Sequence, residues 1–342
     1  MPGSATNHIV CVGAVYIDTI LTVPHFPIED EKLRAKAITR RRGGNTANSL
    51  EVLSQLQHHD PEAARNAQTT DLHLLAVLPN EHSAASKFIC ESLPEVKISG
   101  VTLFRQQHQE AASSYIIQSE ETRSRTIVSS NPLPEMRDDE FMQQVHSFTS
   151  SGGGQEQIAW KKAWFHFEGR VPDVTLSCVR FLREQFPHFG ISVECEKPER
   201  TGMAEVVKYA DVVFYSRLWA GKNGYTDARS FLEEARRDEM TRDGAILCCT
   251  WGSGGATAVV NKGNDDEEVV WADVRAWQVE GGAGQSMVVD TIGAGDTFIA
   301  GMLFAVNEHD EWSLQQKLEF ANELAGRKVL QEGFSGLGKR MW

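Results

Sequence analysis

Segments typical of buried strands alternate with segments of helical spacing through the second half of this 342-residue chain. This alternation limits the fold more than any other feature of the sequence. The segments follow one another at 163–167, 174–186, 190–194, 203–208, 211–215, 228–237 and 245–250. Strands that alternate with helices form a parallel sheet with helices on both faces. The pattern therefore predicts an α/β domain.

Two runs near the start of the chain show a different pattern, in which apolar and polar residues partly alternate. They cover 15–23 and 33–41 and are joined by a Pro-rich turn. Such a pair is typical of an antiparallel ribbon with one buried face and one exposed face. Polar stretches at 148–161 and 261–268 are predicted to be a surface loop and the solvated tip of a hairpin. The remaining predicted strands lie at 8–13, 71–77, 101–104, 113–118 and 125–128. Helices are predicted at about 47–56, 83–93 and 313–331, and one more predicted helix ends at about 306.

The composition excludes several classes of protein. Lys and Arg number 34 against 47 Asp and Glu, so the formal net charge of −13 argues against a nucleic-acid binder and a basic membrane-surface protein. No apolar run approaches the roughly 20 residues of a membrane span, and the first eight residues lack the apolar core of a secretion signal. The six cysteines form no C-x-x-C pair. We therefore expect a cytoplasmic protein that binds neither nucleic acid nor membrane.

The strongest local motif is DTIGAGD at 290–296, between a strand-like run and a long helical pattern. Its small residues Gly293, Ala294 and Gly295 turn the chain into the helix, where unpaired N–H groups attract anions such as phosphate. Asp296 falls in the first helical turn. The helix dipole is expected to keep Asp296 ionised, so that it accepts a proton from an attacking hydroxyl. By itself the motif also fits a tight turn with a helix-capping acid.

A second glycine motif, Gly43-Gly44, stands immediately before another helical pattern. Glycines at such a place let the backbone approach another group closely. Asn45 and Asn48 follow the pair, and Asp18 lies on the first strand of the ribbon. Side chains of this kind at turns bind the vicinal hydroxyls of sugars, although the motif alone also fits the ordinary start of a helix.

The motifs at 43–48 and 290–298 together resemble the two signatures of the ribokinase-like (PfkB) carbohydrate kinase family. Further blocks resemble the ketohexokinase branch of that family in type and order, and they lie at 11–13, 125–128, 166–170, 192–198, 211–214, 325–328 and 333–334. The resemblance implies a three-layer α/β sandwich around a mainly parallel sheet, with a small β-sheet lid. It also implies that residues 1–342 form a single kinase domain, with lid segments at about 15–42 and 101–130.

The reaction implied by the resemblance is transfer of a phosphoryl group from ATP, with Mg²⁺, to a sugar hydroxyl. D-fructose would give fructose 1-phosphate. Asp296 matches the general base of the family, and Gly293, Ala294 and Gly295 match its anion hole. Arg125 matches a lid arginine near the transferred phosphate, with a solvated strand arginine as the alternative. Phosphoryl transfer needs mainly positioning and charge stabilisation, so these groups form a sufficient set.

The sugar-binding positions implied by the family are Asp18, Gly44, Asn45 and Asn48, and Glu168 in the HFEGR block is expected to face the site. In ketohexokinases the lids of two subunits clasp, and an acidic residue of the partner's lid reaches the sugar. The matching position here is Asp30, which implies a homodimer through the lid. The alternatives are a surface ion pair for Glu168 and a solvated acidic turn for Asp30.

The nucleotide-binding positions implied by the family fall in three places: Gly252, Ser253, Gly254 and Gly255 after a strand, Ala325 and Val329 on the last helix, and Lys197. Glu194 and Glu196 resemble the charged cluster beside Mg²⁺, directly or indirectly. The alternatives are an ordinary glycine turn, core packing on the helix, and surface ion pairing for the charged residues.

The sequence departs from the family pattern in two places. The N-x-x-E metal motif of many ribokinase-like enzymes is not evident after Asp211, and the loop at 252–255 has no acid where ketohexokinases have one. The sequence also diverges around 131–132 and in the loops at 58–70 and 148–161. Sugar preference is set partly in such lid regions, so the reaction type is better defined than the sugar. Two other functions stay open: another PfkB-type kinase, of the ribokinase or adenosine-kinase kind, and a catalytically silent sugar-binding regulator on the same fold.

Overall fold

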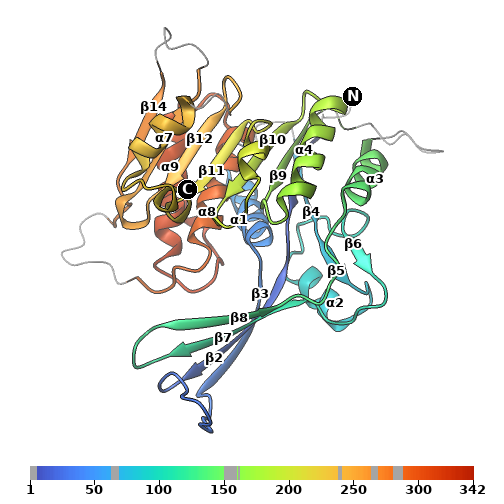
Figure 1. Ribbon diagram of the computed structural model, residues 1–342, viewed down its shortest axis with the longest axis vertical. Helices are drawn as coiled ribbons and strands as arrows, with labels where there is room; N and C mark the ends of the chain where they lie inside the picture. Colours follow the sequence, from blue (N-terminus) through green and yellow to red (C-terminus); the bar gives the residue numbers. More distant parts are fainter. Residues whose placement is uncertain are drawn as a thin grey trace.

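The computed structural model describes residues 6–62, 69–149, 160, 162–237, 241–262, 269–279 and 288–342. Within them, an eight-stranded sheet crosses the main body in the order β14-β13-β12-β11-β10-β9-β1-β4 (Figure 1). The pairs from β12 to β4 in this order are all parallel, and β13 and β14 extend the sheet by antiparallel pairing. The strands are β1 (Thr6–Val12), β4 (Thr69–Leu75), β9 (Ala163–Phe167), β10 (Gly190–Cys195), β11 (Val212–Ser216), β12 (Ile246–Thr250), β13 (Ala256–Val260) and β14 (Trp271–Val274).

Both faces of this sheet are apolar, and each packs against its own set of helices. Along β1, Ile9 and Cys11 belong to one core cluster, whereas Val10 and Val12 belong to the other. Side chains of a strand alternate between its faces, so a strand buried on both sides reads as a continuous apolar run. The first cluster includes α1 (Asn45–His59), α2 (Ala84–Glu91), α8 (Ala294–Glu308) and α9 (Leu314–Lys328), and the second includes α3 (Asp138–Thr149), α4 (Pro172–Gln185), α5 (Met203–Val207), α6 (Arg217–Lys222) and α7 (Ala228–Arg237).

A second sheet projects from the main body as a lid, drawn in blue and teal in Figure 1. Its order is β3-β2-β7-β8, from β2 (Tyr16–Val23), β3 (Ala37–Gly43), β7 (Ala112–Ser119) and β8 (Arg125–Ser130). The outer pairs are antiparallel, and the central pair β2 and β7 is parallel. The short strands β5 (Val77–Pro79) and β6 (Leu103–Arg105) pair with each other instead of joining the lid.

The predicted α/β class, parallel sheet and early antiparallel ribbon are confirmed. The helix α3 is not predicted from the sequence, and it includes the first two residues of the predicted loop at 148–161. The remainder of that loop lies outside the described residues, except Trp160. The predicted hairpin tip at 261–268 lies outside them from residue 263 onward. No helix in the described part of the chain is long and apolar enough to cross a membrane.

The topology brings several segments to one edge of the main sheet. The parallel strands β1, β9 and β10 all end at this edge, because parallel strands share their direction. The lid strands β2 and β3 join the body here, between β1 and α1. Helix α8 packs on α1, so the start of α8 reaches the same edge. Side chains that are far apart in the sequence therefore meet at this place.

Candidate active site

The Gly43-Gly44 pair lets the chain pass closely between the lid and the main sheet. Gly44 has a φ of 106°, and a Cβ there would lie 2.3 Å from the carbonyl oxygen of Ala14. A Cβ on Gly43 would lie 2.6 Å from a carboxylate oxygen of Asp18. Gly44 therefore requires glycine, whereas a side chain at Gly43 would displace the Asp18 carboxylate. The pair holds the Asp18 carboxylate against the start of α1.

Asp18 lies on β2 and is buried. Its register partner on β7 is Ser114, whose hydroxyl bonds to the carboxylate, and Arg41 approaches within 3.8 Å. Burial raises the pKa of Asp18, while Arg41 and the Ser114 hydroxyl act in the opposite direction. The Asp18 carboxylate is therefore buried and has few hydrogen-bond donors around it in the described residues. Such a carboxylate can accept hydrogen bonds from the hydroxyl groups of a ligand.

A chain of hydrogen bonds connects α1 to the first turn of α8. The Asn48 Nδ2 group donates to Oδ2 of Asp296 at 2.7 Å, and Arg42 donates to Oδ1 of Asn48 at 2.7 Å. Arg42 also forms an ion pair with Glu51. The Ser49 hydroxyl donates to the backbone carbonyl of Asp296 at 3.0 Å. These bonds hold Asp296 in a fixed orientation, although the residues that donate them are 248 and 247 positions away in the sequence.

Asp296 is buried, and its surroundings raise its pKa well above the usual range. Burial is the largest cause, and the carboxylate of Glu194 is the next; the Asn48 hydrogen bond acts against both. Desolvation and the neighbouring acids therefore act against the helix dipole that was expected to keep Asp296 ionised. A raised pKa is nevertheless what a general base near neutral pH requires.

The start of α8 has the form of an anion site. Gly293 is the N-cap with a φ of 76°, and no side chain among the described residues caps the helix. A Cβ on Gly293 would lie 2.3 Å from the Phe334 ring, whereas a Cβ on Gly295 would meet open space. Among the described residues the space beside Gly295 is therefore open, while the Ala294 N–H bonds to the Thr291 backbone carbonyl at 3.3 Å. Such a helix start fits a phosphate group.

Asp290 anchors the loop before α8. One of its carboxylate oxygens accepts a hydrogen bond from the backbone of Ile292 at 2.9 Å, and the buried Lys328 lies 3.1 Å from the other. Arg41 and the lid residue Arg125 approach the same carboxylate at 3.6 and 3.9 Å. Together the backbone bond and Lys328 outweigh burial and lower the pKa of Asp290. Two arginines from the lid thus point to the loop that forms the anion site.

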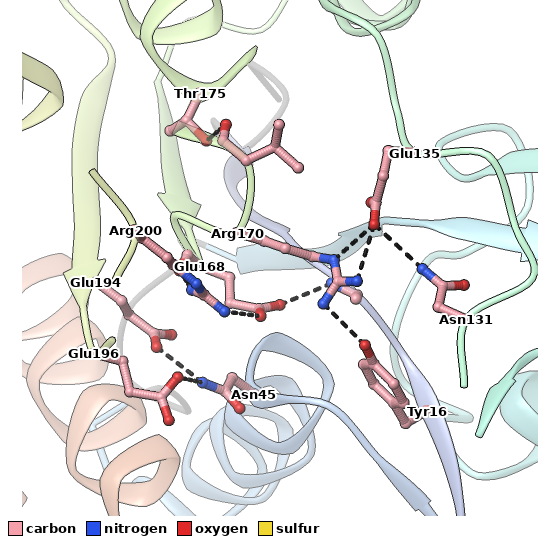
Figure 2. Close-up of polar contacts among 12 residues, drawn as sticks. Tyr16, Asn45, Asn131, Glu135, Glu168, Arg170, Thr175, Glu194, Glu196 and Arg200 are labelled. Atoms are coloured by element: carbon pink, nitrogen blue, oxygen red, sulfur yellow. Dashed lines mark hydrogen bonds and ion pairs between the residues drawn. The ribbon is translucent and has the colours of Figure 1, made fainter. Parts of the chain in front are cut away.

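A cluster of carboxylates surrounds Asn45 at the start of α1, as Figure 2 shows. The Asn45 side chain donates to Glu194 at 3.0 Å and to Glu196 at 3.3 Å. Burial, together with the charges of Glu168 and Glu196, raises the pKa of Glu194 well above its usual range. This excess of buried negative charge fits a hard divalent cation such as Mg²⁺, which prefers carboxylate oxygens. The sequence placed Glu194 and Glu196 beside the metal on the family resemblance alone.

Two further networks support this cluster. His166 on β9 bonds to Glu194 at 3.1 Å and to the Ser192 hydroxyl at 2.9 Å, and burial lowers its pKa to about 3. Glu168 accepts a bond from the Ala14 backbone at 2.9 Å and lies 3.4 Å from Arg200. Glu168 therefore faces the site as expected, but it also holds the end of β1 in place.

The loop after β9 is tied to the base of the lid. Arg170 donates to the Tyr16 hydroxyl on β2 at 2.9 Å and forms an ion pair with Glu135 at 2.9 Å (Figure 2). Asn131 donates to Glu135 at 3.3 Å. These bonds fix the segment after β8 and the start of β2 to the main body, so the base of the lid is held in place.

The candidate nucleotide positions lie along β12, α9 and the end of β10. Gly252, Ser253 and Gly254 form an exposed turn after β12, and Gly255 has a φ of 93° where a Cβ would lie 1.9 Å from a backbone oxygen of β14. Ala325 and Val329 are half-buried on or next to α9, and Ala325 packs against the core. Lys197 is exposed just beyond β10. The Val329 carbonyl accepts a bond from Val289 at 2.8 Å, which ties α9 to the loop before α8.

The structure groups the residues predicted for catalysis, sugar binding and metal binding into one centre, with Asp30 apart from it. This centre lies at the junction of β1, β10, α1 and α8, and Arg125 reaches it from the lid. Its members are Asp18, Gly44, Asn45, Asn48, Glu168, Glu194, Glu196, Gly293, Ala294, Gly295 and Asp296. Asp30 lies in the exposed turn at the far end of the lid. Sequence reasoning gave no role to Arg41, Arg42 or Lys328. In the sequence, Lys328 differs from its surroundings only because it is a lysine on the side of its helix that otherwise faces the core.

A family model described as pfkB family carbohydrate kinase matches residues 6–337. Among curated proteins, ketohexokinase from Mus musculus is 30% identical over 342 aligned positions, which cover 97% of this chain and 99% of that protein. Both similarities extend over nearly the whole chain, so they include the lid as well as the main sheet.

Solved structures with the same arrangement include several ribokinases. The ribokinase from Cryptococcus neoformans in complex with ADP has a TM-score of 0.64 at 15% identity, with 98% of this chain and 99% of that chain covered. The ribokinase from Thermotoga maritima has a TM-score of 0.67 at 14% identity, with 97% and 98% covered. The ribokinase from Arabidopsis thaliana complexed with ribose and ATP has a TM-score of 0.67 at 16% identity, with 97% and 96% covered. At these identities the similarity establishes the ribokinase-like fold.

Proposed function

This chain belongs to the pfkB family of carbohydrate kinases, and we propose from this premise that it uses ATP to phosphorylate a hydroxyl of a ketose. D-fructose, converted to fructose 1-phosphate, is the substrate we put first. The similarity to mouse ketohexokinase across the chain supports this choice over an aldose or a nucleoside. The coarser statement, a phosphotransferase acting on a carbohydrate, follows from the family alone.

The observation that carries the proposal is the position of Asp296. Its carboxylate is buried at the start of α8, beside the uncapped Gly293 turn, and Asn48 holds it at 2.7 Å. In the proposed reaction Asp296 accepts the proton of the attacking sugar hydroxyl. The N–H groups at Gly293, Ala294 and Gly295 stabilise the charge that develops on the transferred phosphoryl group.

The sugar is proposed to lie between Asp18, the start of α1 and Asp296. Asp18 is buried at the root of the lid, and Asn45 and Gly44 stand at the start of α1. Hydroxyl groups of a sugar would bond to the carboxylate of Asp18 and the amide of Asn45. Asn48 already uses both of its polar groups, toward Arg42 and Asp296. We therefore assign Asn48 first to holding the base and only secondarily to the sugar.

ATP and Mg²⁺ fit the remaining groups. The uncapped start of α8 and the nearby Arg125 suit the phosphates, and the exposed turn at Gly252 suits the nucleoside end. Mg²⁺ would be held, directly or through water, by Glu194 and Glu196, and when bound it supplies neutralisation of phosphate charge. Lys197, Ser253, Gly254, Gly255, Ala325 and Val329 complete the proposed nucleotide site.

A homodimer through the lid is part of the proposal. One face of the lid carries exposed apolar side chains, namely Ile38 at 69% exposure, Tyr115 at 51% and Val128 at 60%, and the other face carries Ile127 at 51%. Large apolar residues gathered on an exposed sheet are typical of a protein–protein interface. In a clasped pair, Asp30 at the tip of one lid would reach the sugar of the partner subunit.

Two alternatives compete with a fructose kinase. A kinase of the ribokinase or nucleoside type would share the base and the anion site but accept a different hydroxyl compound. A catalytically silent sugar-binding regulator would need no base. The intact Asp296 and its supporting bonds from Asn48 and Ser49 favour catalysis.

The test is a panel of acceptors with MgATP, in which ADP release is measured and the product is examined by phosphorus NMR. We expect turnover of fructose, with phosphate on the hydroxyl of carbon 1. Turnover of ribose or adenosine but not of fructose would replace the first substrate by one of the alternatives. Nucleotide or sugar binding without turnover of any acceptor would favour the silent regulator.

A further inference from the structure

Two histidines and an aspartate meet at the end of the main sheet that lies away from the candidate active site. His8 stands early in β1, and Asp71 and His73 stand in β4. His8 is five residues before Gly13, so the trio lies about 16 Å along the strand from the edge where the site forms. None of the groups proposed for catalysis belongs to this cluster.

The strand register brings the three side chains to one face of the sheet. His8 pairs with Asp71 across the parallel strands β1 and β4, and His73 is two residues beyond Asp71. Residues in register and residues two apart share a face. On β1 and β4 that face continues with Val10 and Leu75, which belong to the core cluster beneath α3 and α4. The convergence is therefore a consequence of the backbone pairing, not of flexible side chains.

The distances among the ligand atoms suit a small metal ion. Nδ1 of His8 lies 3.1 Å from Nε2 of His73 and 3.8 Å from Oδ2 of Asp71, and the three residues each offer a ligand atom within 4.8 Å of the others. Two nitrogen ligands of a tetrahedral zinc ion, at bond lengths of 2.0–2.1 Å, are about 3.3 Å apart. Two histidines and one carboxylate are a common ligand set for zinc, and they leave one position open.

The hydrogen-bonding capacity of the two rings is not used up. Both histidines are buried, with 8% and 4% of their surfaces exposed. Nδ1 of His73 has no partner among the described residues, and the bond between the two rings satisfies only one nitrogen of each.

The surroundings close the site on one side and leave access on the other. Trp160 stacks on His8 with ring centroids 3.9 Å apart and also approaches His73 at 4.8 Å. Lys97 forms an ion pair with Asp71 at 2.5 Å, but its side chain is 55% exposed. An exposed ion pair contributes little free energy, so Lys97 can leave Asp71 to solvent when another cation binds.

We propose that His8, Asp71 and His73 form a binding site for a divalent transition metal, with zinc as the preferred ion. The site joins β1 to the edge strand β4 at the end of the sheet remote from the active site. Its role is structural: a bound ion stabilises the folded state and leaves the kinase chemistry unchanged. The ion is distinct from the Mg²⁺ proposed at Glu194 and Glu196, because that site offers carboxylates and this one offers imidazoles.

The test uses untagged full-length protein freed of metal with a chelator and then titrated with Zn²⁺ by calorimetry. Co²⁺ serves as a second probe, because its visible absorption reports a tetrahedral nitrogen and oxygen ligand set. We expect saturable binding of one equivalent and a higher Tm with zinc. The His8→Asn and Asp71→Asn variants should weaken binding roughly tenfold or more. Asp71→Asn changes a partly exposed residue, so it tests the site even if His8→Asn does not fold.

A matched control comes from the second group of potential ligands, Glu62, His309 and Glu311, in which both carboxylates are exposed. Glu311→Gln removes one ligand there and should leave zinc binding unchanged. If wild-type protein shows no saturable binding, or if His8→Asn and Asp71→Asn bind zinc as tightly as wild type, the proposal is wrong. Loss of binding in Glu311→Gln alone would move the site to that second group.

Discussion

Replacement of Asn48 by leucine tests how the protein sets the pKa of its proposed base. The Asn48 side chain donates to Asp296 at 2.7 Å, and this bond favours the ionised carboxylate. A hydrogen bond to a charged group contributes about 1.5–3 kcal/mol, and one pKa unit corresponds to about 1.36 kcal/mol. Asn48→Leu should therefore raise the pKa of Asp296 by about one to two units. Leucine resembles asparagine in shape and keeps water out of the gap.

The assay is the pH dependence of kcat/KM, measured from ADP release at subsaturating sugar. Asp296 must be ionised to accept a proton, so activity falls as pH falls through its pKa. The midpoint of this acid limb should move to higher pH in Asn48→Leu by the amount given above. An acid limb that stays in place, or moves to lower pH, would refute the reasoning.

Ser49→Ala provides the matched control. Ser49 is the neighbour of Asn48 and donates to the backbone carbonyl of Asp296 at 3.0 Å, not to the carboxylate. Loss of this hydrogen bond should lower the free energy of unfolding by about 1 kcal/mol and leave the acid limb of the pH profile unchanged. Asn48→Leu also removes one hydrogen bond of Arg42, which keeps its ion pair with Glu51, and urea denaturation of both variants separates this loss of stability from the pKa effect.

Two other variants test separate parts of the site. Gly293→Ala should lower both the Tm and kcat. The new Cβ would lie 2.3 Å from the Phe334 ring, and the φ of 76° disfavours residues other than glycine. A Tm equal to that of wild type would contradict this prediction. Asp30→Ala should raise the KM for sugar roughly tenfold while kcat and the Tm stay near wild type, provided that sedimentation shows a dimer. An unchanged KM in a dimeric enzyme would remove Asp30 from the partner's site.

The fold was largely predictable because its signals are local. Buried strands and amphipathic helices follow each other in the sequence with short connections, and the Gly-Gly and Gly-Ala-Gly motifs mark the two helix starts. The helix α3 was missed because only Phe141 and Val145 of its residues are fully buried, so its apolar periodicity is weak. The separate pairing of β5 with β6 depends on contacts that sequence spacing does not show.

The residues of the candidate site could be proposed from the sequence, but their electrostatics could not. The bond from Asn48 to Asp296 and the pair of Lys328 with Asp290 join distant parts of the chain, and no local pattern marks them. The helix dipole alone suggested a readily ionised Asp296. The structure adds the burial and the three nearby glutamates, which act against ionisation and raise the pKa. A pKa depends on everything packed around the group, and only the tertiary structure supplies this information.

The central claim, that this chain transfers phosphate with Asp296 as the base, is tested most directly by Asp296→Asn. Asparagine keeps the size of the side chain and its bond to Asn48 but cannot take a proton. With MgATP and the preferred sugar, kcat should fall by about 10²–10⁴-fold, while ATP binding measured by calorimetry stays within a small factor of wild type. A kcat close to that of wild type in a variant that still binds ATP would contradict the account.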